Sequence, residues 1–212
     1  MTGPEPFVLP DLASWRAWLD EHEDTSDGVW LLLAKRGTTA PTTIDYQEAL
    51  LEALASGWID GQRRGVDGTC FVQRFTPRRA RSIWSQRNIG LVERLAAEGR
   101  LRPRGLAEVD AAQADGRWAR AYAGPATIEV PPDLEAALAV SPAAGATFAG
   151  LNSQNRFAVL HRIVTAPNDA TRARRLARLV DMLARGETPY PQPARSAAGP
   201  AAGAVGADRA DG

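Results

Sequence analysis

Residues 58–77 read WIDGQRRGVDGTCFVQRFTP, and this stretch decides the expected fold. The Asp-Gly pair at its middle is a strong hairpin signal between two segments of strand-favouring residues. In the second segment Phe71 and Phe75 share one face, because alternate residues of a strand point the same way. Pro77 ends the segment, since proline cannot donate to a strand ladder. The stretch therefore predicts a β-hairpin.

The residues before the hairpin predict a further strand and two helices. The continuous apolar run VWLLLA at 29–34 is typical of a buried strand. Asp11 can cap a first helix, and Asp45 with Glu48 three residues later begins a second helix in the manner of a capping box. We therefore expect residues 1–100 to form an α+β part with the hairpin and a basic loop.

The chain after about residue 100 has the apolar spacing of helices. Pro103 suits the first turn of one helix, and leucines at helical spacing mark the last helix. We predict an all-helical part over residues 101–190. Residues 191–212 are rich in Ala, Gly and Pro, without apolar periodicity, and predict a disordered tail. The expected fold class is α+β, with a small N-terminal sheet-and-helix part followed by the helical part.

Composition narrows the expected location and partners. Basic and acidic residues balance at 25 each, so general attraction to nucleic acid or anionic lipid is not expected. One cysteine, Cys70, suits a reducing cytosol. The N-terminus lacks a signal-peptide pattern, and no apolar run approaches the roughly 20 residues of a spanning helix. We expect a cytoplasmic protein that does not insert into a membrane.

The sequence predicts no metal and no cofactor. Its two histidines, His22 and His161, each fall on an apolar helical stripe, and no ligand pair accompanies them. Walker-type and GxGxxG loops are absent, which excludes the nucleotide folds that use them. Cys70 lies in a predicted strand, where a packed and inert thiol is expected.

Arginine is concentrated around the hairpin. Residues 58–87 contain seven arginines and two acids. Arg78, Arg79 and Arg81 crowd the connection just before a predicted helix. Guanidinium groups bind phosphate and carboxylate, and a helix start offers free N–H donors and partial positive charge. The segment predicts a site for an anion.

The candidate site comprises the basic connection and its neighbours. Trp84 and Trp58 can provide flat faces for stacking, and Ser82 or Ser85 can cap the helix. The predicted anion-binding residues are Arg74, Arg78, Arg79, Arg81, Ser82, Trp84 and Trp58. Asp60 can orient an arginine or act as a general base, which makes it the candidate catalytic residue. The alternative is structural: solvated arginines, tryptophans in the core, and Asp60 paired with an arginine.

Three segments resemble the YdeI/OmpD-associated family, whose members are also described as bacteriocin-protection proteins. They read EALASGWIDG, QRFTPRRARSIWSQRN and GRLRPRGLAEVDAAQADGRWARAY. The later segment TRARRLARLVDMLARG is also similar, and the resemblance covers roughly residues 7–190. It implies a small cytoplasmic α+β protein of the YjbR kind with an appended helical region. It also implies a role in tolerance to bacteriocins, antimicrobial peptides and stress, and it carries over no catalytic residue.

Three functions remain open from the sequence. The first is a non-enzymatic binding or adaptor protein that recognises a small anionic ligand or a protein partner. The second is a small enzyme acting on an anionic metabolite, with Arg78 and Arg81 holding the substrate and Asp60 as acid or base. The third is a nucleic-acid binder, which needs a continuous basic face and is disfavoured by the balanced charge.

Overall fold

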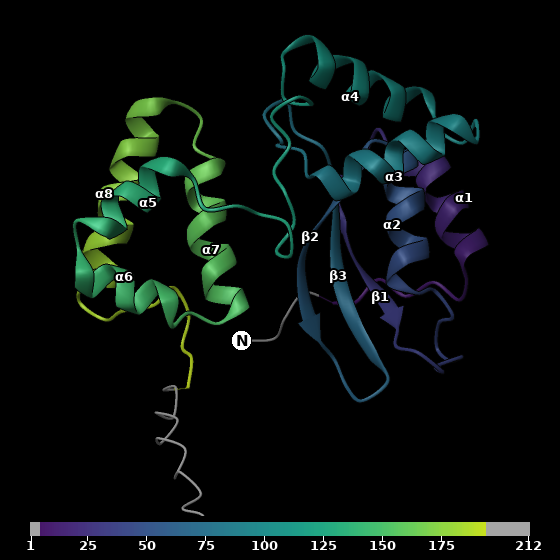
Figure 1. The fold of residues 1–212 in the computed structure, drawn as a ribbon. Helices are drawn as coiled ribbons and strands as arrows, with labels where there is room; N and C mark the ends of the chain where they lie inside the picture. The colour runs from purple at the N-terminus through teal and green to yellow at the C-terminus, as the bar shows by residue number, and fades with distance from the viewer. Residues whose placement is uncertain (1–4, 194–212) are drawn as a thin grey trace, which may run out of the picture. The chain divides into compact units, whose positions relative to one another are not determined.

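The computed structural model describes residues 5–193, which form eight helices and three strands (Figure 1). The chain divides into two compact units between Glu129 and Val130. The first unit contains the sheet and α1 to α4, and the second contains α5 to α8. The predicted fold class, an N-terminal sheet-and-helix part followed by a helical part, is confirmed.

The sheet is antiparallel, with strand order β1-β3-β2. Its strands are β1 (Val29–Ala34), β2 (Trp58–Gly65) and β3 (Cys70–Pro77). The hairpin of β2 and β3 is the predicted one, but its loop is longer than two residues. Asp67 Oδ1 accepts hydrogen bonds from the backbone N–H groups of Thr69 and Cys70, each at 2.7 Å. These two bonds hold a four-residue loop.

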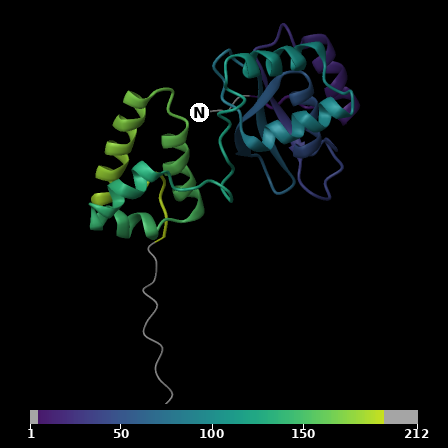
Figure 2. The ribbon, with the colours of Figure 1, turned by 45° about the horizontal axis from the view of Figure 1, so that its top comes forward.

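One face of the sheet packs against helices (Figures 1 and 2). The helices are α1 (Leu12–His22), α2 (Tyr46–Ala55) and α3 (Gln86–Ala97). Phe71 and Phe75 point into this core, as the alternation predicted, and join Trp15 and Leu50 there. The predicted cap at Asp11 is confirmed, since its carboxylate accepts from the Ser14 N–H. The capping box at the start of α2 is also present.

The other face of the sheet carries a smaller cluster. Leu32, Cys70 and Val72 are buried there, with Trp30 packed against them. Cys70 is a free thiol with 1% exposure, so the expectation of a packed cysteine is confirmed. Both faces of β3 are therefore buried, because it is the central strand.

The free edge of β2 is irregular. A register shift lies between Asp60 and Arg63. The buried Gln73 side chain donates to the carbonyls of Gly61 (2.9 Å) and Gln62 (3.2 Å), which the bulge removes from the ladder. Gln73 can therefore be buried on the core face of β3, because its amide hydrogen-bonds these carbonyls.

Arginines lie over both faces of this edge. The Arg63 guanidinium lies 3.8 Å from the centre of the Phe71 ring, and the Arg64 guanidinium lies 4.3 Å from the Trp30 ring. At the opposite edge of the sheet, Phe7 exchanges backbone hydrogen bonds with β1: its N–H donates to the Trp30 carbonyl, and its carbonyl accepts from Leu32 N–H.

Helix α4 (Pro103–Ala114) begins at the predicted proline and belongs to the first unit, so the predicted helical part over 101–190 is divided between the two units. The Arg102 N–H donates to the Ala55 carbonyl at the end of α2. A Cβ placed on Gly105 would lie 2.3 Å from that carbonyl oxygen, so α4 approaches α2 at a point that only glycine permits. This packing places the division between the units after residue 129.

The second unit contains α5 (Pro132–Ala139), α6 (Pro142–Ala149), α7 (Ser153–Val164) and α8 (Asp169–Ala184). Its buried apolar residues include Leu134, Phe148, Leu160, Ile163 and Leu183. The cap of α8 is Asn168, whose side chain accepts from Thr171 N–H, rather than Asp169.

The predicted disordered tail begins at residue 191, and residues 194–212 lie outside the described part of the chain. Contacts with the second unit continue as far as Gln192. Its Oε1 accepts hydrogen bonds from Asn155 Nδ2 (2.8 Å) and Asn152 N–H (3.1 Å).

Candidate anion site

The connection between β3 and α3 carries the predicted site. β3 ends at Pro77, and α3 follows Ser85, whose Oγ accepts from Asn88 N–H at 3.1 Å. Ser82 does not cap the helix. Its Oγ accepts from Arg79 N–H at 2.9 Å and closes a turn within the connection. Of the two serines proposed as caps, Ser85 is the one that caps α3.

The start of α3 offers fewer free donors than predicted. The Gln86 N–H already donates to the Tyr122 carbonyl at 2.9 Å, and Asn88 N–H is bonded to Ser85. Two of the first three helix donors thus have partners within the protein. The helix start therefore contributes less to an anion site than the arginine side chains could.

Arg78 and Trp84 form a buried stack. The Arg78 guanidinium carbon lies 3.4 Å from the centre of the Trp84 ring, a close cation–π contact. The two residues are only 4% and 2% exposed. Trp118, which follows α4, packs on Trp84 with ring centroids 4.9 Å apart. A guanidinium is therefore enclosed between residues that are far apart in the sequence.

Three donors of this stack have no acceptor among residues 5–193. They are Nε and Nη2 of Arg78 and Nε1 of Trp84, all buried. The Nη1 of Arg78 donates to the Ile83 carbonyl over a long 3.4 Å. A buried donor without an acceptor costs about 1–3 kcal/mol. An acceptor-bearing guest would remove this cost at all three atoms.

No carboxylate lies within ion-pair distance of Arg78 in the described residues. Burial lowers the pKa of Arg78 to about 10, and the more distant charges of Glu108 and Asp60 only partly offset it. The charge of Arg117 lowers the pKa further. Arg78 remains a cation at neutral pH, so it is a buried positive charge that no acid of residues 5–193 pairs at close range.

Asp60 lies in a polar cluster near this stack. The Tyr46 hydroxyl donates to Asp60 Oδ2 at 2.8 Å, and Arg87 Nη1 donates to the Tyr46 hydroxyl at 3.3 Å. Burial and the Asp60 charge raise the pKa of Tyr46 to about 12. The same two causes raise the pKa of Tyr122. Both phenols therefore stay protonated at neutral pH and can act as donors.

The other predicted residues do not join the stack. Arg79 and Arg81 are exposed on the connection. Arg74 donates to the Asp27 carbonyl at 3.3 Å. Trp58 is fully buried in the core, where its Nε1 donates to the Glu23 carbonyl at 3.2 Å. Of the predicted set, the structure brings together Arg78 and Trp84.

Three residues near the stack were not among the predicted site residues. Arg117 Nη1 donates to the Ser82 carbonyl at 3.1 Å and so holds the connection. Trp118 covers Trp84, and Tyr122 forms an isolated bridge with Ser85. All three come from the segment after α4, about 40 residues downstream, so only the tertiary fold places them here.

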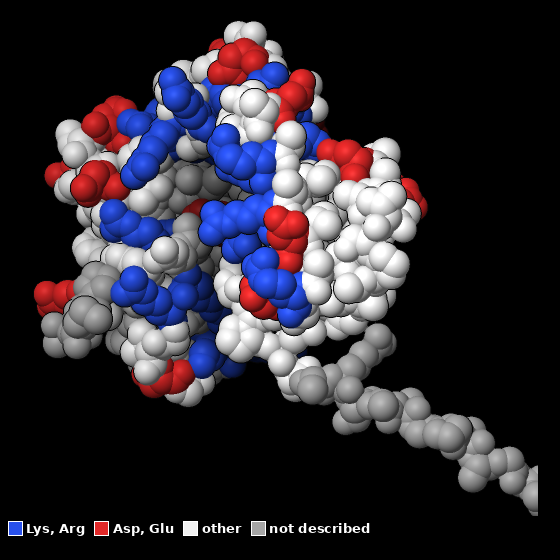
Figure 3. Space-filling model, turned by 90° about the vertical axis from the view of Figure 1, so that its left-hand side faces the viewer, with Lys and Arg blue, Asp and Glu red and all other residues white. Residues whose placement is uncertain are grey.

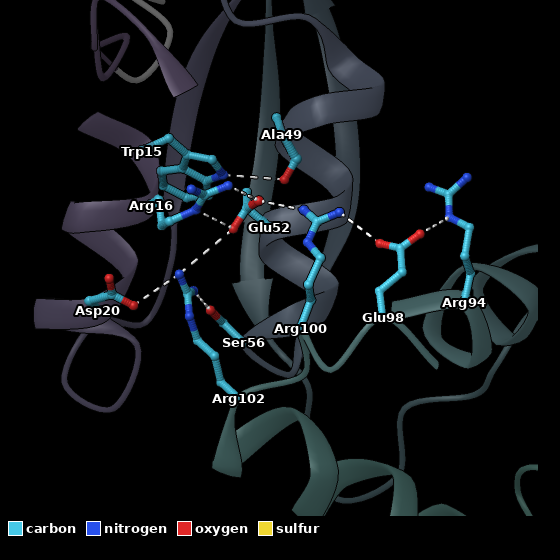
Figure 4. Close-up of polar contacts among 10 residues, drawn as sticks. All are labelled: Trp15, Arg16, Asp20, Ala49, Glu52, Ser56, Arg94, Glu98, Arg100 and Arg102. Atoms are coloured by element: carbon cyan, nitrogen blue, oxygen red, sulfur yellow. Dashed lines mark hydrogen bonds and ion pairs between the residues drawn. The ribbon is translucent and has the colours of Figure 1, made fainter. Parts of the chain in front are cut away.

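A second arginine cluster surrounds Glu52 on α2, and here the charge is paired (Figure 4). Glu52 is 4% exposed. Arg16 donates to both of its oxygens, at 3.1 and 2.7 Å, and Arg100 Nη2 donates to Oε1 at 2.8 Å. Burial alone raises the pKa of Glu52, but Arg16 and Arg100 outweigh it and hold the pKa below its usual value.

Arg102 extends this network. Its Nη2 lies 2.9 Å from Asp20 and 3.7 Å from Glu52, and its Nη1 donates to Ser56 Oγ. The network joins α1, α2 and the turn before α4, as Figure 4 shows. Because its buried carboxylate is fully hydrogen-bonded, the network fits a structural role.

Two kinds of feature are absent from the described part of the chain. No group of three His, Cys, Asp or Glu side chains there could hold a metal ion. Nor is any of the helices in residues 5–193 both long and apolar enough to cross a membrane.

Comparison with known families divides the chain as its fold does. Residues 127–186 match the family described as "Bacteriocin-protection, YdeI or OmpD-Associated". Residues 7–108 match a separate domain, described as "Domain of unknown function (DUF8412)". No curated protein and no solved structure matches this chain.

The resemblance to the YdeI/OmpD-associated family is thus confirmed, through residues 127–186. The segment TRARRLARLVDMLARG, at residues 171–186, lies inside that match. The hairpin motifs at residues 58–87 lie instead in the match to the domain of unknown function. The family description therefore applies to the helical unit, and the arginine stack belongs to a different domain.

Proposed function

We propose that this protein is a non-enzymatic binding protein of the cytoplasm that supports tolerance to bacteriocins and other stress. Its N-terminal unit binds a small anion, such as a phosphate or carboxylate compound, at the Arg78–Trp84 stack. The association with bacteriocin protection rests on the family match of residues 127–186.

The observation that carries the proposal is the donor-only character of the stack. Arg78 and Trp84 together present three buried N–H groups that lack acceptors among residues 5–193, on a cation that no nearby carboxylate pairs. Oxygens of an anion can accept hydrogen bonds from such donors and also offset the charge of Arg78, whereas a neutral guest can do only the first. Arg78 is 4% exposed, so binding requires the side chains around it to open.

A second candidate function is catalysis at Asp60. The hydrogen bond from Tyr46 to Asp60 at 2.8 Å places a carboxylate next to a phenol of raised pKa. On an anionic metabolite held by Arg78, Asp60 would act as the acid or base. Asp60→Asn separates the two functions, because it removes turnover and leaves anion binding in place.

Thermal unfolding with and without ligand tests the anion site. The probes are inorganic phosphate, citrate and nucleoside monophosphates. At a concentration 100 times the Kd, a ligand that binds only the folded state stabilises it by about 2.7 kcal/mol. We expect at least one probe to raise the Tm of the wild type, and Arg78→Met to remove that increase.

Arg81→Ala is the matched control, because it removes an exposed arginine from the same connection. It should keep the full ligand-induced increase in Tm. Equal increases in the wild type and in Arg78→Met would reject the site, and so would the absence of any increase in the wild type. A separate assay measures survival under bacteriocin, where Arg78→Met should lose protection and Arg81→Ala should retain it.

A further inference from the structure

Helices α7 and α8 of the second unit line a groove of about 710 Å³. Its basic side chains are Arg162, Arg175, Arg178 and Arg185, and its apolar ones include Leu179 and Met182. Leu179 is buried, Met182 is half-buried, and the arginines lie around them, with Arg178 exposed. The groove therefore combines an apolar floor with a cationic rim.

The charge of this rim is largely unpaired. Among residues 5–193, Glu187 is the one carboxylate that lines the groove, and it already accepts from Nε and Nη2 of Arg185, both at 2.9 Å. Within residues 5–193, no carboxylate lies within ion-pair distance of Arg162, Arg175 or Arg178. Figure 3 draws the basic side chains of one face in blue and the acidic ones in red.

The neighbouring histidine adds no charge at neutral pH. Burial and the charges of Arg175 and Arg162 lower the pKa of His161, which also lines the groove. Three guanidinium groups of Arg162, Arg175 and Arg178 thus remain without a carboxylate.

The groove residues of α8 follow one helical stripe. Arg175, Arg178, Met182 and Arg185 lie at i, i+3, i+7 and i+10, so they share a face about 15 Å long. A partner that fits this stripe carries acidic groups beside apolar side chains at the same spacing. We propose that the groove binds an acidic amphipathic helix of a protein partner, with leucine-like side chains on Leu179 and Met182.

Two other occupants fit less well. Single-stranded nucleic acid relies on aromatic side chains for base stacking, and no Phe, Tyr or Trp lines this groove. Amphipathic antimicrobial peptides carry Lys and Arg on their polar face, so the rim would repel them. If the second unit supports bacteriocin protection, the charge favours recruitment of an acidic partner over direct capture of a cationic peptide.

This inference is independent of the Arg78 site, since the groove belongs to the second unit and to the bacteriocin-protection match. The test is fluorescence anisotropy of the full chain with a labelled 15-residue helical peptide that carries Glu on one face and Leu on the other. The comparison probes are a scrambled peptide, the same peptide with Lys for Glu, and a single-stranded oligonucleotide of equal length. We expect the acidic amphipathic peptide to bind most tightly and the Lys peptide not to bind.

Two charge reversals on α8 form a matched pair. Arg178 lines the groove, whereas Arg174 lies on the same helix outside the lining, and both are exposed. Arg178→Glu should weaken binding of the acidic peptide by about tenfold, and Arg174→Glu by less than about threefold. Met182→Gln should weaken it as well, through the apolar floor.

Equal losses in the two charge reversals would overturn the proposal, as would the absence of binding by the acidic peptide. Equal binding of the scrambled peptide would overturn the amphipathic match, and tighter binding of the oligonucleotide would assign the groove to nucleic acid. Arg78→Met should leave the peptide affinity unchanged, so failure here is distinguishable from failure of the anion site.

Discussion

Two arginine clusters in the N-terminal unit use the same side chain in opposite ways. Around Glu52, three arginines meet one buried carboxylate, and the carboxylate has its hydrogen bonds filled. Around Trp84, a single arginine is more deeply buried than any of those three and meets no carboxylate within ion-pair distance in residues 5–193.

Whether a buried arginine has a carboxylate partner decides which role it suits: a paired arginine suits stability, and an unpaired one suits ligand binding. A buried carboxylate with close cationic partners contributes to holding the helices together, and removal of one partner is costly. A buried cation without a close carboxylate is a cost to the folded state, and a bound guest or an ordered water can reduce that cost. The oxygens of Glu52 thus have their hydrogen bonds, whereas three donors of the Arg78–Trp84 stack have no acceptor among residues 5–193.

The largest expected effect is the loss of the Glu52 charge. Glu52→Gln should lower the free energy of unfolding by about 3 kcal/mol, because Arg16 and Arg100 lose the charge of the carboxylate that they both bond and Arg102 loses one of its nearby acids. Urea denaturation at pH 7 measures it. Glu93→Gln, the same change at an exposed position of α3, is the control and should stay within about 0.5 kcal/mol. Equal effects at both positions would show that the network is not stabilising.

Lowering the pH should reduce the difference in unfolding free energy between the wild type and Glu52→Gln. The pKa of Glu52 is lower in the folded chain than its ordinary value of 4.5, so its contribution is complete above pH 4.5 and is lost as the pH falls through the folded pKa. The gap in unfolding free energy between the wild type and Glu52→Gln should therefore narrow below pH 4.5. Denaturation curves at pH 7, 5, 4 and 3 measure it, and a constant gap would contradict the assignment.

A smaller effect of opposite sign is expected at Arg78. Arg78→Met removes an unpaired buried charge and keeps an apolar stem on Trp84, so the free energy of unfolding should stay the same or rise by up to about 1 kcal/mol. Arg102→Met, in the paired cluster, should instead lower it by about 2 kcal/mol. Urea denaturation of the two variants gives the comparison. A marked loss at Arg78 would mean that the stack already has its partner.

The smallest effect is expected at the outer end of the Glu52 network. Arg94 and Glu98 form an i, i+4 pair at 3.7 Å, and both side chains are more than 40% exposed. Arg94→Gln should lower the free energy of unfolding by about 0.3 kcal/mol, a change that 0.5 M NaCl should remove. A salt-independent loss would indicate that the network extends further than its buried part.

Local signals predicted most of the fold. The Asp-Gly pair, the apolar run at 29–34 and the capping box at Asp45 act over a few residues, and each produced the expected element. The helix from Pro103 was predicted, but its packing in the first unit was not, because that packing depends on Gly105 meeting the end of α2, a contact between distant segments. Sequence spacing carries no information on such a contact.

The candidate site was predictable only in part, because it too depends on contacts between segments that are far apart in the sequence. Arg78, Arg79 and Arg81 look alike in the sequence, yet only Arg78 is buried, because Trp84 and the downstream Trp118 enclose it. Glu52 gave no signal either, since it lies within a run of Ala and Leu that predicts a core helix face. Which arginine is paired and which is open depends on tertiary contacts.

The margins of the sheet have a consequence for how other molecules can engage the N-terminal unit. Phe7 occupies one margin through its main chain, and the bulge with Arg63 and Arg64 interrupts the other. Sheet edges of this kind resist the addition of a strand from another chain, and they therefore resist edge-to-edge aggregation. A foreign strand would therefore find little free main chain to pair with on this sheet.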